Sequence, residues 1–352
     1  MLVRYKTLQD GSVVKQAEIY TRDEHDIDPD RIDFEARKIV RRLSSKGHTA
    51  YVVGGAVRDL LVGKQPKDFD IATDAAPGRI RKLFRNSRII GKRFRLVHIL
   101  LRDNQVIEVS TFRARESEGF QNIYGDIEDD ALRRDFTLNA LYYSPEDETI
   151  LDYTGGFKDI RNRKVRPVIP VDRIFVEDPV RLIRAIKYSV GTDFRLTFTL
   201  RRAMKKSTGL LSEVSPSRMT EELFKILESG RSHDVFRQLL KFGIADYVVP
   251  GLGELVKDRG YIGKLMTSLA SLDELIARKP VGRDVCLAYL CGDYLFAHSP
   301  LDPEARIPFP EAFVTMKQFL RPLVPPNRDI EDALTYLLKR KRTYLKTGRL
   351  DH

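Results

Sequence analysis

The chain has little of the chemistry on which disulfide frameworks, zinc sites and membrane spans depend. Its 352 residues include no tryptophan, two cysteines and six histidines. Two cysteines, Cys286 and Cys291, are too few for a disulfide framework, so we expect buried, reduced thiols in a cytoplasmic protein. Six scattered histidines argue against a zinc site. No apolar run approaches the length of a membrane span and none follows the N-terminus directly, so we expect neither membrane insertion nor secretion.

Positive charge is in excess, with a formal net charge of +11 at pH 7, which predicts a polyanionic partner. A first cluster without any acidic residue consists of Arg79, Arg81, Lys82, Arg85, Arg88, Lys92, Arg93 and Arg95. A second cluster, near the C-terminus, consists of Lys339, Arg340, Lys341, Arg342, Lys346 and Arg349. Charge runs are often solvated faces, and for the second cluster that alternative stays open. The first cluster closely follows an acidic pair, which favours a path for a phosphate backbone.

That acidic pair, Asp68 and Asp70, is the most informative feature of the sequence. In a strand, residues two apart point to the same face, so Phe69 and Ile71 can be buried while both carboxylates share one site. Facing carboxylates repel each other unless a cation lies between them. The pair therefore predicts a divalent metal, and hard oxygen ligands favour magnesium carrying substrate phosphates. The alternative is a solvated Asp-x-Asp motif on an edge strand.

A Gly-Gly turn precedes this pair and opens a short helix. Gly54 and Gly55, followed by Arg58, offer backbone N–H groups and a positive helix end to phosphates. The combination of this turn with the acidic pair favours a phosphate-handling site over two unrelated structural motifs.

The length and the periodicity predict two or three domains. We expect a loosely ordered extension over residues 1–30, an α/β head over 31–150, a neck over 151–230 and a helical body with a basic tail over 231–352. In the head, a hairpin over 94–101 and 105–112 would direct Glu108 away from the buried face, and helices would cover one face of the sheet. Helices are expected over 178–189, 197–206, 217–228, 231–241, 260–278, 282–296, 309–321 and 328–345.

Five motifs occur in an order that resembles the class II template-independent RNA nucleotidyltransferases, the family of CCA-adding enzymes and bacterial poly(A) polymerases. They are GGAVRD (54–59) with DFD (68–70), RRDFTLNA (133–140), DYTGG (152–156), EDPVR (177–181) and SRMTEEL (217–223). The resemblance covers about residues 48–250. It implies a polymerase-β-like head, with helices on one face of its sheet, followed by an all-α neck and body.

The resemblance also implies a two-metal site in which Asp68 and Asp70 hold Mg²⁺. Two residues compete as the third carboxylate. Glu108 is the geometric candidate, with a salt bridge to a nearby arginine as its alternative role. Asp135 is the candidate from the resemblance, and capping a helix that begins near Thr137 is compatible with that role.

The family further implies that Arg134, Asp135 and Asn139 contact the ribose and phosphates of the incoming nucleotide. Asp178 and Arg181 would read its base. On a helix these two residues share a face, and together they can imitate the hydrogen-bonding edge of a base. An intrahelical ion pair between them is the alternative.

Three further residues complete the expected neck. Arg184, one turn beyond Arg181, would hold a phosphate or fix Asp178. Arg218 and Glu222, spaced i and i+4, are expected to brace the body rather than to touch substrate.

Within the family, residues 89–98 (IIGKRFRLVH) resemble a motif of the bacterial poly(A) polymerases, with Lys92 where arginine is usual. His98 is expected to be a strand residue without chemistry. The sequence thus predicts addition of AMP from ATP to RNA 3′ ends with release of pyrophosphate. CCA addition to tRNA is the alternative enzyme function, and a catalytically inactive RNA-binding relative is the alternative of another class.

Overall fold

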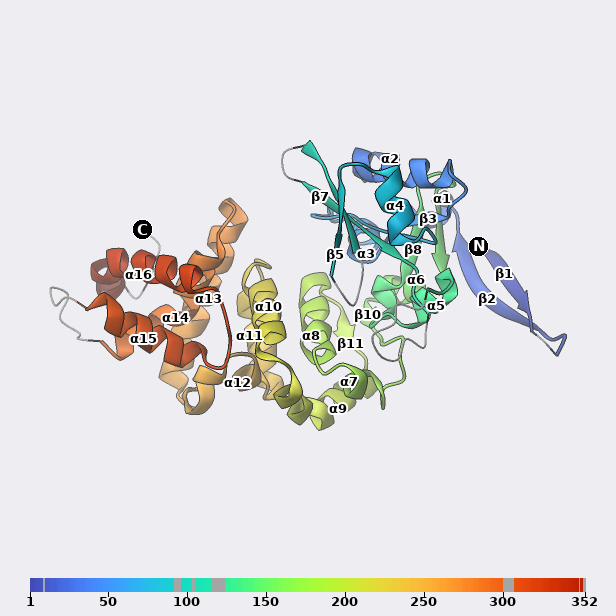
Figure 1. Ribbon diagram of the computed structural model, residues 1–352. Helices are drawn as coiled ribbons and strands as arrows, with labels where there is room; N and C mark the ends of the chain where they lie inside the picture. The colour runs from blue at the N-terminus through green and yellow to red at the C-terminus, as the bar shows by residue number, and fades with distance from the viewer. Residues whose placement is uncertain are drawn as a thin grey trace. The chain divides into compact units, whose positions relative to one another are not determined.

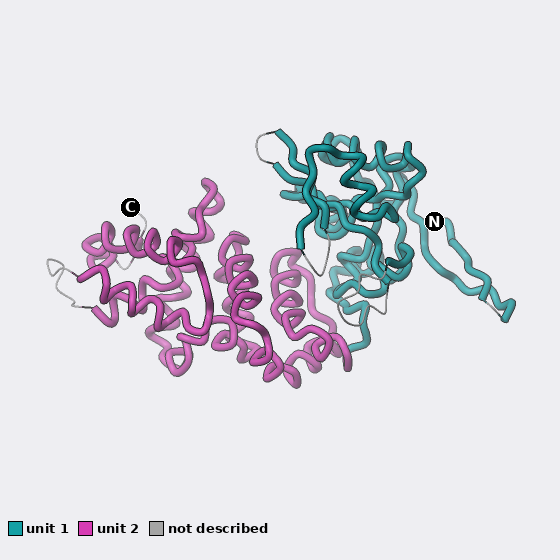
Figure 2. The backbone as a smooth tube through the Cα atoms, viewed as in Figure 1, with its two compact units in different colours: residues 1–171 teal, residues 172–352 magenta. Residues whose placement is uncertain are grey.

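The computed structural model describes residues 1–8, 10–91, 96–102, 105–114, 124–299, 307–347 and 349–350. The chain forms two compact units, residues 1–171 and 172–352 (Figure 2). The finer boundaries expected at residues 150 and 230 stay predictions. Part of the stretch 89–98, including Lys92, Arg93 and Arg95, lies outside the described residues. No helix in the described part of the chain is long and apolar enough to cross a membrane.

The first unit is built on a nine-stranded sheet with the order β1-β2-β9-β8-β3-β4-β7-β6-β5 (Figure 1). Its strands are β1 (Leu2–Thr7), β2 (Val13–Tyr20), β3 (Ala50–Val53), β4 (Asp70–Thr73), β5 (Ser87–Ile90), β6 (Leu96–Leu100), β7 (Val106–Thr111), β8 (Leu141–Ser144) and β9 (Thr149–Asp152). Strands β4 and β7 pair in parallel, whereas the other neighbouring strands are antiparallel.

The expectation of a loosely ordered segment over residues 1–30 is wrong, because β1 and β2 extend the sheet at the edge of β9. Buried Tyr20 stacks on Phe157, with 3.9 Å between ring centroids. The buried carboxylate of Glu18 accepts a 2.6 Å hydrogen bond from the Lys158 ammonium. These partners lie far away in the sequence, so local periodicity could not reveal the hairpin.

Helices α2 (Phe34–Ser44) and α4 (Pro77–Leu83) pack against strands of this sheet. Helix α2 begins at a helix cap, since Asp33 Oδ1 accepts hydrogen bonds from the N–H groups of Glu35 and Ala36. It buries Ala36, Ile39, Val40 and Leu43. The other short elements of this unit are α1 (Arg22–His25), η1 (Pro29–Arg31), α3 (Gly55–Leu61), α5 (Ile127–Leu132), η3 (Thr137–Asn139), α6 (Gly156–Arg161) and β10 (Lys164–Val165).

Burial alternates along β7 as expected. Ile107, Val109 and Thr111 are buried, whereas Glu108 and Ser110 are partly exposed on the opposite face. At β7 the sheet therefore has one covered face and one face on which polar side chains are accessible, whereas all four residues of β8 are buried.

The second unit is almost wholly helical. Its elements are α7 (Ile174–Glu177), α8 (Arg181–Thr192), β11 (Arg195–Leu196), α9 (Phe198–Ser207), η4 (Thr208–Glu213), α10 (Pro216–Leu227), α11 (Ser232–Phe242), α12 (Ala245–Val248), η5 (Pro250–Lys257), α13 (Arg259–Arg278), α14 (Arg283–Ala297), α15 (Phe309–Leu320) and α16 (Asn327–Thr347). All eight expected helices are present, with ends shifted by a few residues. Cys286 and Cys291 are free, buried thiols of α14, as predicted.

Candidate active site

Asp68 and Asp70 lie on an extended segment that leads into β4. The strand begins at Asp70, so Asp68 precedes it rather than lying within it. The predicted alternation holds nonetheless, because Phe69 is 8% exposed and Ile71 is fully buried while both aspartates are exposed residues. The extended backbone thus separates the two carboxylates from the core.

Glu108 belongs to the same acidic site by strand register. Strands β4 and β7 are parallel, and Asp70 lies opposite Glu108. Although Asp70 keeps an exposed surface, the protein atoms packed around its carboxylate displace water and raise its pKa to about 6. The negative charges of Glu108 and Asp68 act in the same direction, against the charge of Arg134. Among the described residues, His98 on β6 takes the place of the expected arginine: its Nε2 lies 3.1 Å from Glu108 Oε1, and the two form an ion pair when the imidazole is protonated.

This accumulation of negative charge suits a hard divalent cation. In the described ranges, no three His, Cys, Asp or Glu side chains are gathered closely enough to hold an ion by themselves. Mg²⁺ usually keeps water and substrate oxygens among its ligands and needs only one or two protein carboxylates. Asp68 and Asp70 therefore fit the ion as a pair.

Asp135, the second candidate for the third carboxylate, does not cap a helix. Its Oδ1 accepts a 2.8 Å hydrogen bond from the N–H of Phe136, and Phe136 occupies the N-cap position of the single 3₁₀ turn η3. The carbonyl of Asp135 accepts from the Val168 N–H. The choice between Glu108 and Asp135 stays a prediction, in which the strand register supports Glu108.

The Gly-Gly turn connects β3 to α3 and requires glycine. Gly54 has φ +70° and ψ −129°, a backbone conformation that side chains disfavour. A Cβ at Gly54 would lie 3.5 Å from Nη1 of Arg134, and one at Gly55 would lie 3.5 Å from Nη2 of Arg58. Two guanidinium groups therefore lie against the turn.

A hydrogen-bond network joins these arginines through Asn139. Arg58 Nη1 donates to Asn139 Oδ1 at 2.8 Å, and Arg134 Nη1 donates to the Asn139 carbonyl at 3.0 Å. Asn139 is 8% exposed, so its amide is fixed. The network thereby links the motif at 54–59 to the motif at 133–140. Arg58 also pairs with Asp59 at 2.8 Å and Arg134 with Asp130 at 3.0 Å, so carboxylates partly balance the guanidinium charges beside the turn. The N–H donors gathered around the turn suit a polyphosphate.

Sequence reasoning missed two residues that orient Arg134. Its Nη2 donates to Asp130 Oδ2 and its Nε to the Tyr142 hydroxyl, both at 3.0 Å, and that hydroxyl donates to Asp130 Oδ2 at 2.7 Å. Asp130 could have been found from its i, i+4 spacing to Arg134. Tyr142 gave no local signal because it reaches the arginine from β8.

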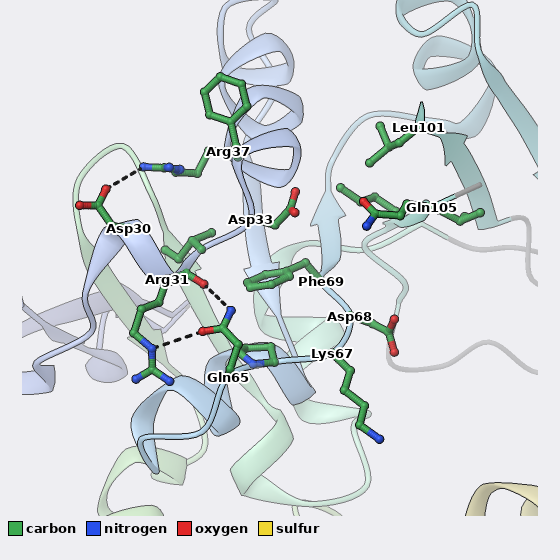
Figure 3. A pocket seen from close by; sticks show the side chains of 15 residues that line it. Asp30, Arg31, Asp33, Arg37, Gln65, Lys67, Asp68, Phe69, Leu101 and Gln105 are labelled. Atoms are coloured by element: carbon green, nitrogen blue, oxygen red, sulfur yellow. Dashed lines mark hydrogen bonds and ion pairs between the residues drawn. The ribbon is translucent and has the colours of Figure 1, made fainter. Parts of the chain in front are cut away.

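A cavity of about 570 Å³ lies beside the segment that carries Asp68 (Figure 3). Arg31 and Gln65 form its wall and fix that segment. Arg31 Nη2 donates to the Gly63 carbonyl at 3.2 Å, and Gln65 Nε2 donates to the Arg31 carbonyl at 3.1 Å. In Figure 3 the carboxylate of Asp68 points away from the ring of Phe69. These hydrogen bonds therefore connect the loop before β4 to η1.

The expected helical pairing of Asp178 and Arg181 is wrong in its geometry. Asp178 follows α7 with an extended backbone, and α8 begins only at Arg181. Nη1 of Arg181 donates to the Ile174 carbonyl at 3.1 Å and to Glu177 Oε2 at 3.2 Å. Pro179 after Asp178 explains the break, since a residue before proline disfavours the helical region. The base-reading roles of the two residues stay predictions.

Glu222 is a structural brace, as predicted. It is 2% exposed and forms ion pairs with Lys187 at 2.8 Å, and with Arg184 and Lys225 at 3.5 Å each. The expected roles of Arg184, a phosphate contact or fixation of Asp178, stay predictions beside this contact with Glu222. Arg218, by contrast, donates to Asp178 at 2.6 Å and so reaches the proposed base-reading motif.

The two cation clusters differ in burial. Arg79, Arg81 and Lys82 on α4 are exposed, as are Arg85 and Arg88 after it. In the C-terminal cluster, Lys341 is buried, and the guanidinium of Arg340 lies 3.7 Å from the ring centroid of Tyr336. The C-terminal cluster is therefore not a uniformly solvated face.

Comparison with known proteins assigns both units to one family. Residues 50–166 match the family model described as the poly A polymerase head domain, and residues 193–255 match that described as the probable RNA and SrmB-binding site of polymerase A. Poly(A) polymerase I of Haemophilus influenzae is 39% identical over 290 residues, which are 77% of this chain and 62% of that protein. The CCA-adding enzyme of Bacillus subtilis is 36% identical over 220 residues, 60% of this chain and 54% of that protein.

The chain thus spans less than two thirds of the length of these relatives. Among solved structures, the CCA-adding enzyme of Bacillus stearothermophilus in complex with CTP superposes with a TM-score of 0.62 at 26% identity. That match covers 89% of this chain and 78% of the other. With the predicted motifs in order, both family models matched and the fold shared, the chain belongs to the poly(A) polymerase and CCA-adding enzyme family of nucleotidyltransferases.

Proposed function

We propose that this protein is a template-independent poly(A) polymerase that transfers AMP from ATP to RNA 3′ ends. The observation that carries the proposal is the acidic site of Asp68, Asp70 and Glu108 in the same head as the arginine-lined turn at Gly54. In this reaction the RNA 3′-hydroxyl attacks the α-phosphate in line. The bond between the α-phosphate and the bridging oxygen breaks, and pyrophosphate leaves.

Different residues of the chain would bind the metal ion and the triphosphate. Asp68 and Asp70 would hold Mg²⁺, which when bound supplies Lewis-acid activation of the hydroxyl and neutralises phosphate charge. The Gly54 and Gly55 backbone, with Arg58 and Arg134, would bind the triphosphate. Glu108 or Asp135 would serve as the third carboxylate.

The proposed contacts to the ribose and to the base lie in two regions. Asn139, whose amide is fixed by Arg58 and Arg134, would hold the ribose together with Asp135. In the second unit, Asp178 and Arg181 would read the base. The similarity of the motifs to those of the family supports these assignments.

The proposed partner is RNA, which would be bound through its phosphates. Exposed cations of α4 and the stretch 193–255, which matches the RNA-binding model, support this proposal. A cytoplasmic location follows from the same proposal and agrees with two free, buried thiols.

CCA addition to tRNA is the second candidate function, because the relative from Bacillus subtilis and the structure with CTP are CCA-adding enzymes. A single assay separates the two functions: extension of an unstructured RNA and of a tRNA lacking its 3′ end, with each nucleotide supplied alone and with ATP and CTP supplied together. Long tails from ATP on the unstructured RNA support poly(A) synthesis. CTP incorporation on tRNA, followed by one adenylate and arrest, would establish CCA addition. If the protein is instead a catalytically inactive RNA-binding relative, neither RNA is extended.

A further inference from the structure

The carboxylate of Asp178 is held from two directions. Its Oδ1 accepts a 3.2 Å hydrogen bond from the Val180 N–H, and its Oδ2 accepts a 2.6 Å hydrogen bond from Nη2 of Arg218, a residue 40 positions further along. The side chain of Asp178 is 16% exposed, whereas that of Arg218 is 47% exposed. Because Asp178 lies between α7 and α8, no helix fixes its backbone, and these two contacts fix the direction of its carboxylate.

Arg181 is oriented by a different set of partners. Its guanidinium donates to the Ile174 carbonyl and to Glu177, both on α7, and its side chain is only 13% exposed. Asp178 and Arg181 therefore do not position each other by forming a mutual pair. Arg218 therefore orients the side chain of Asp178, whereas residues of α7 orient the side chain of Arg181.

We infer that Arg218 is a positioning residue for nucleotide selection, because it fixes the direction in which Asp178 presents its acceptor oxygens. This inference rests on the proposed base-reading role of Asp178. Discrimination between bases requires hydrogen bonds of defined direction, and an acceptor that rotates can satisfy more than one base edge. Loss of Arg218 therefore relaxes selectivity, whereas loss of Asp178 removes the acceptor.

The attachment of α10 does not depend on Arg218. The same helix carries buried Glu222, with its three cationic partners, and Glu221, which pairs with Arg283 of α14 at 3.0 Å. The Thr220 hydroxyl accepts a hydrogen bond from the Val324 N–H at 2.9 Å. A half-exposed ion pair adds little to stability, so removing Arg218 leaves α10 in place.

The test compares Arg218→Gln and Arg218→Lys with Arg283→Gln as the matched control. Arg283 also forms an ion pair with α10 but contacts Glu221 and Glu228, not Asp178. Competing ATP and CTP incorporation into one unstructured RNA gives the ratio of kcat/KM values. We expect Arg218→Gln to lower the ATP preference on the order of tenfold, Arg218→Lys to recover part of it, and Arg283→Gln to leave it unchanged.

Two outcomes overturn the inference. Selectivity that is unchanged in Arg218→Gln while Asp178→Ala loses it shows that Asp178 reads the base without Arg218. Equal losses of selectivity in Arg218→Gln and Arg283→Gln show that Arg218 is only a brace. Failure of the proposed function is distinguishable, because the unmodified protein would then not extend RNA with ATP. RNA affinity measured on the same variants is expected to stay constant.

Discussion

Asp70 on β4 and Glu108 on β7 lie opposite each other on two parallel, hydrogen-bonded strands. The third acidic residue, Asp68, precedes β4 and adds its charge to theirs. This negative charge is opposed by Arg134 and, when it is protonated, by His98 beside Glu108, and a proton or a metal ion on the carboxylates relieves the remaining repulsion. Metal affinity and folding stability are therefore both expected to depend on pH.

Metal binding is expected to stabilise the protein more at pH 7.5 than at pH 5. Because the pKa of Asp70 is raised to about 6, its favourable contribution to stability is present below its ordinary pKa and is lost as pH rises through about 6. Mg²⁺ needs the ionised carboxylate and must displace a proton below that value. The measurement is the Mg²⁺-induced change in Tm of the nucleotide-free protein at both pH values. An equal Mg²⁺-induced change in Tm at both pH values would contradict the prediction. The same pH dependence of that change in Asp70→Asn would also contradict it.

Gly54→Ala should impair both stability and activity. The backbone at Gly54 has φ +70°, and an added Cβ would meet Nη1 of Arg134 at 3.5 Å. We expect destabilisation of about 1–3 kcal/mol and a raised KM for ATP. Gly78→Ala in α4 is the matched control, because a Cβ there meets nothing within 4 Å. A Gly54→Ala variant that behaves like the control would show that the turn does not need glycine.

Glu222→Gln is expected to destabilise the second unit by about 1–3 kcal/mol, because it leaves Lys187, whose side chain is only 17% exposed, without its anion. The pKa of Glu222 is lowered, despite burial, by Lys187, Lys225 and Arg184. Its stabilising contribution is therefore present above its ordinary pKa and is lost as pH falls through the lowered one. Urea unfolding at pH 7 measures the effect. The exposed pair of Glu254 and Lys257 supplies the control variant, Glu254→Gln, for which less than about 1 kcal/mol is expected.

Replacing Arg81, Lys82 and Arg85 together by alanine should weaken binding of single-stranded RNA. If each contacts one phosphate, the slope of log K against log salt concentration becomes shallower by about 2. The control triple variant replaces Lys38, Lys257 and Arg278, each of which already pairs with a glutamate. It removes the same net charge. An identical change of slope in both variants would show a general charge effect instead of an RNA contact.

The sequence was most informative where function depends on residues close together in the chain. Gly54, Arg58, Asp68 and Asp70 belong to one local segment that runs from the end of β3 to the start of β4, so their placement near one another could be predicted from spacing. Periodicity likewise predicted the long helices, since their apolar faces repeat within each element.

The features that were missed depend on long-range contacts. The β1–β2 hairpin is ordered by β9 and α6, and Arg134 is oriented by Tyr142 from a later strand. Helical spacing also misassigned the pair of Asp178 and Arg181, because Asp178 lies before the helix and contacts Arg218, 40 residues away. No local pattern encodes such partners.

The most direct test of the central claim is adenylate addition to an unstructured RNA by the unmodified protein and by Asp70→Asn, with ATP and Mg²⁺. We predict tails of many adenylates for the former and none for the latter. RNA affinity should be unchanged or higher in the variant, because removing a negative charge does not weaken attraction to a polyanion. Asp70→Asn activity above a few per cent of that of the unmodified protein would contradict the assignment of the metal site to Asp68 and Asp70.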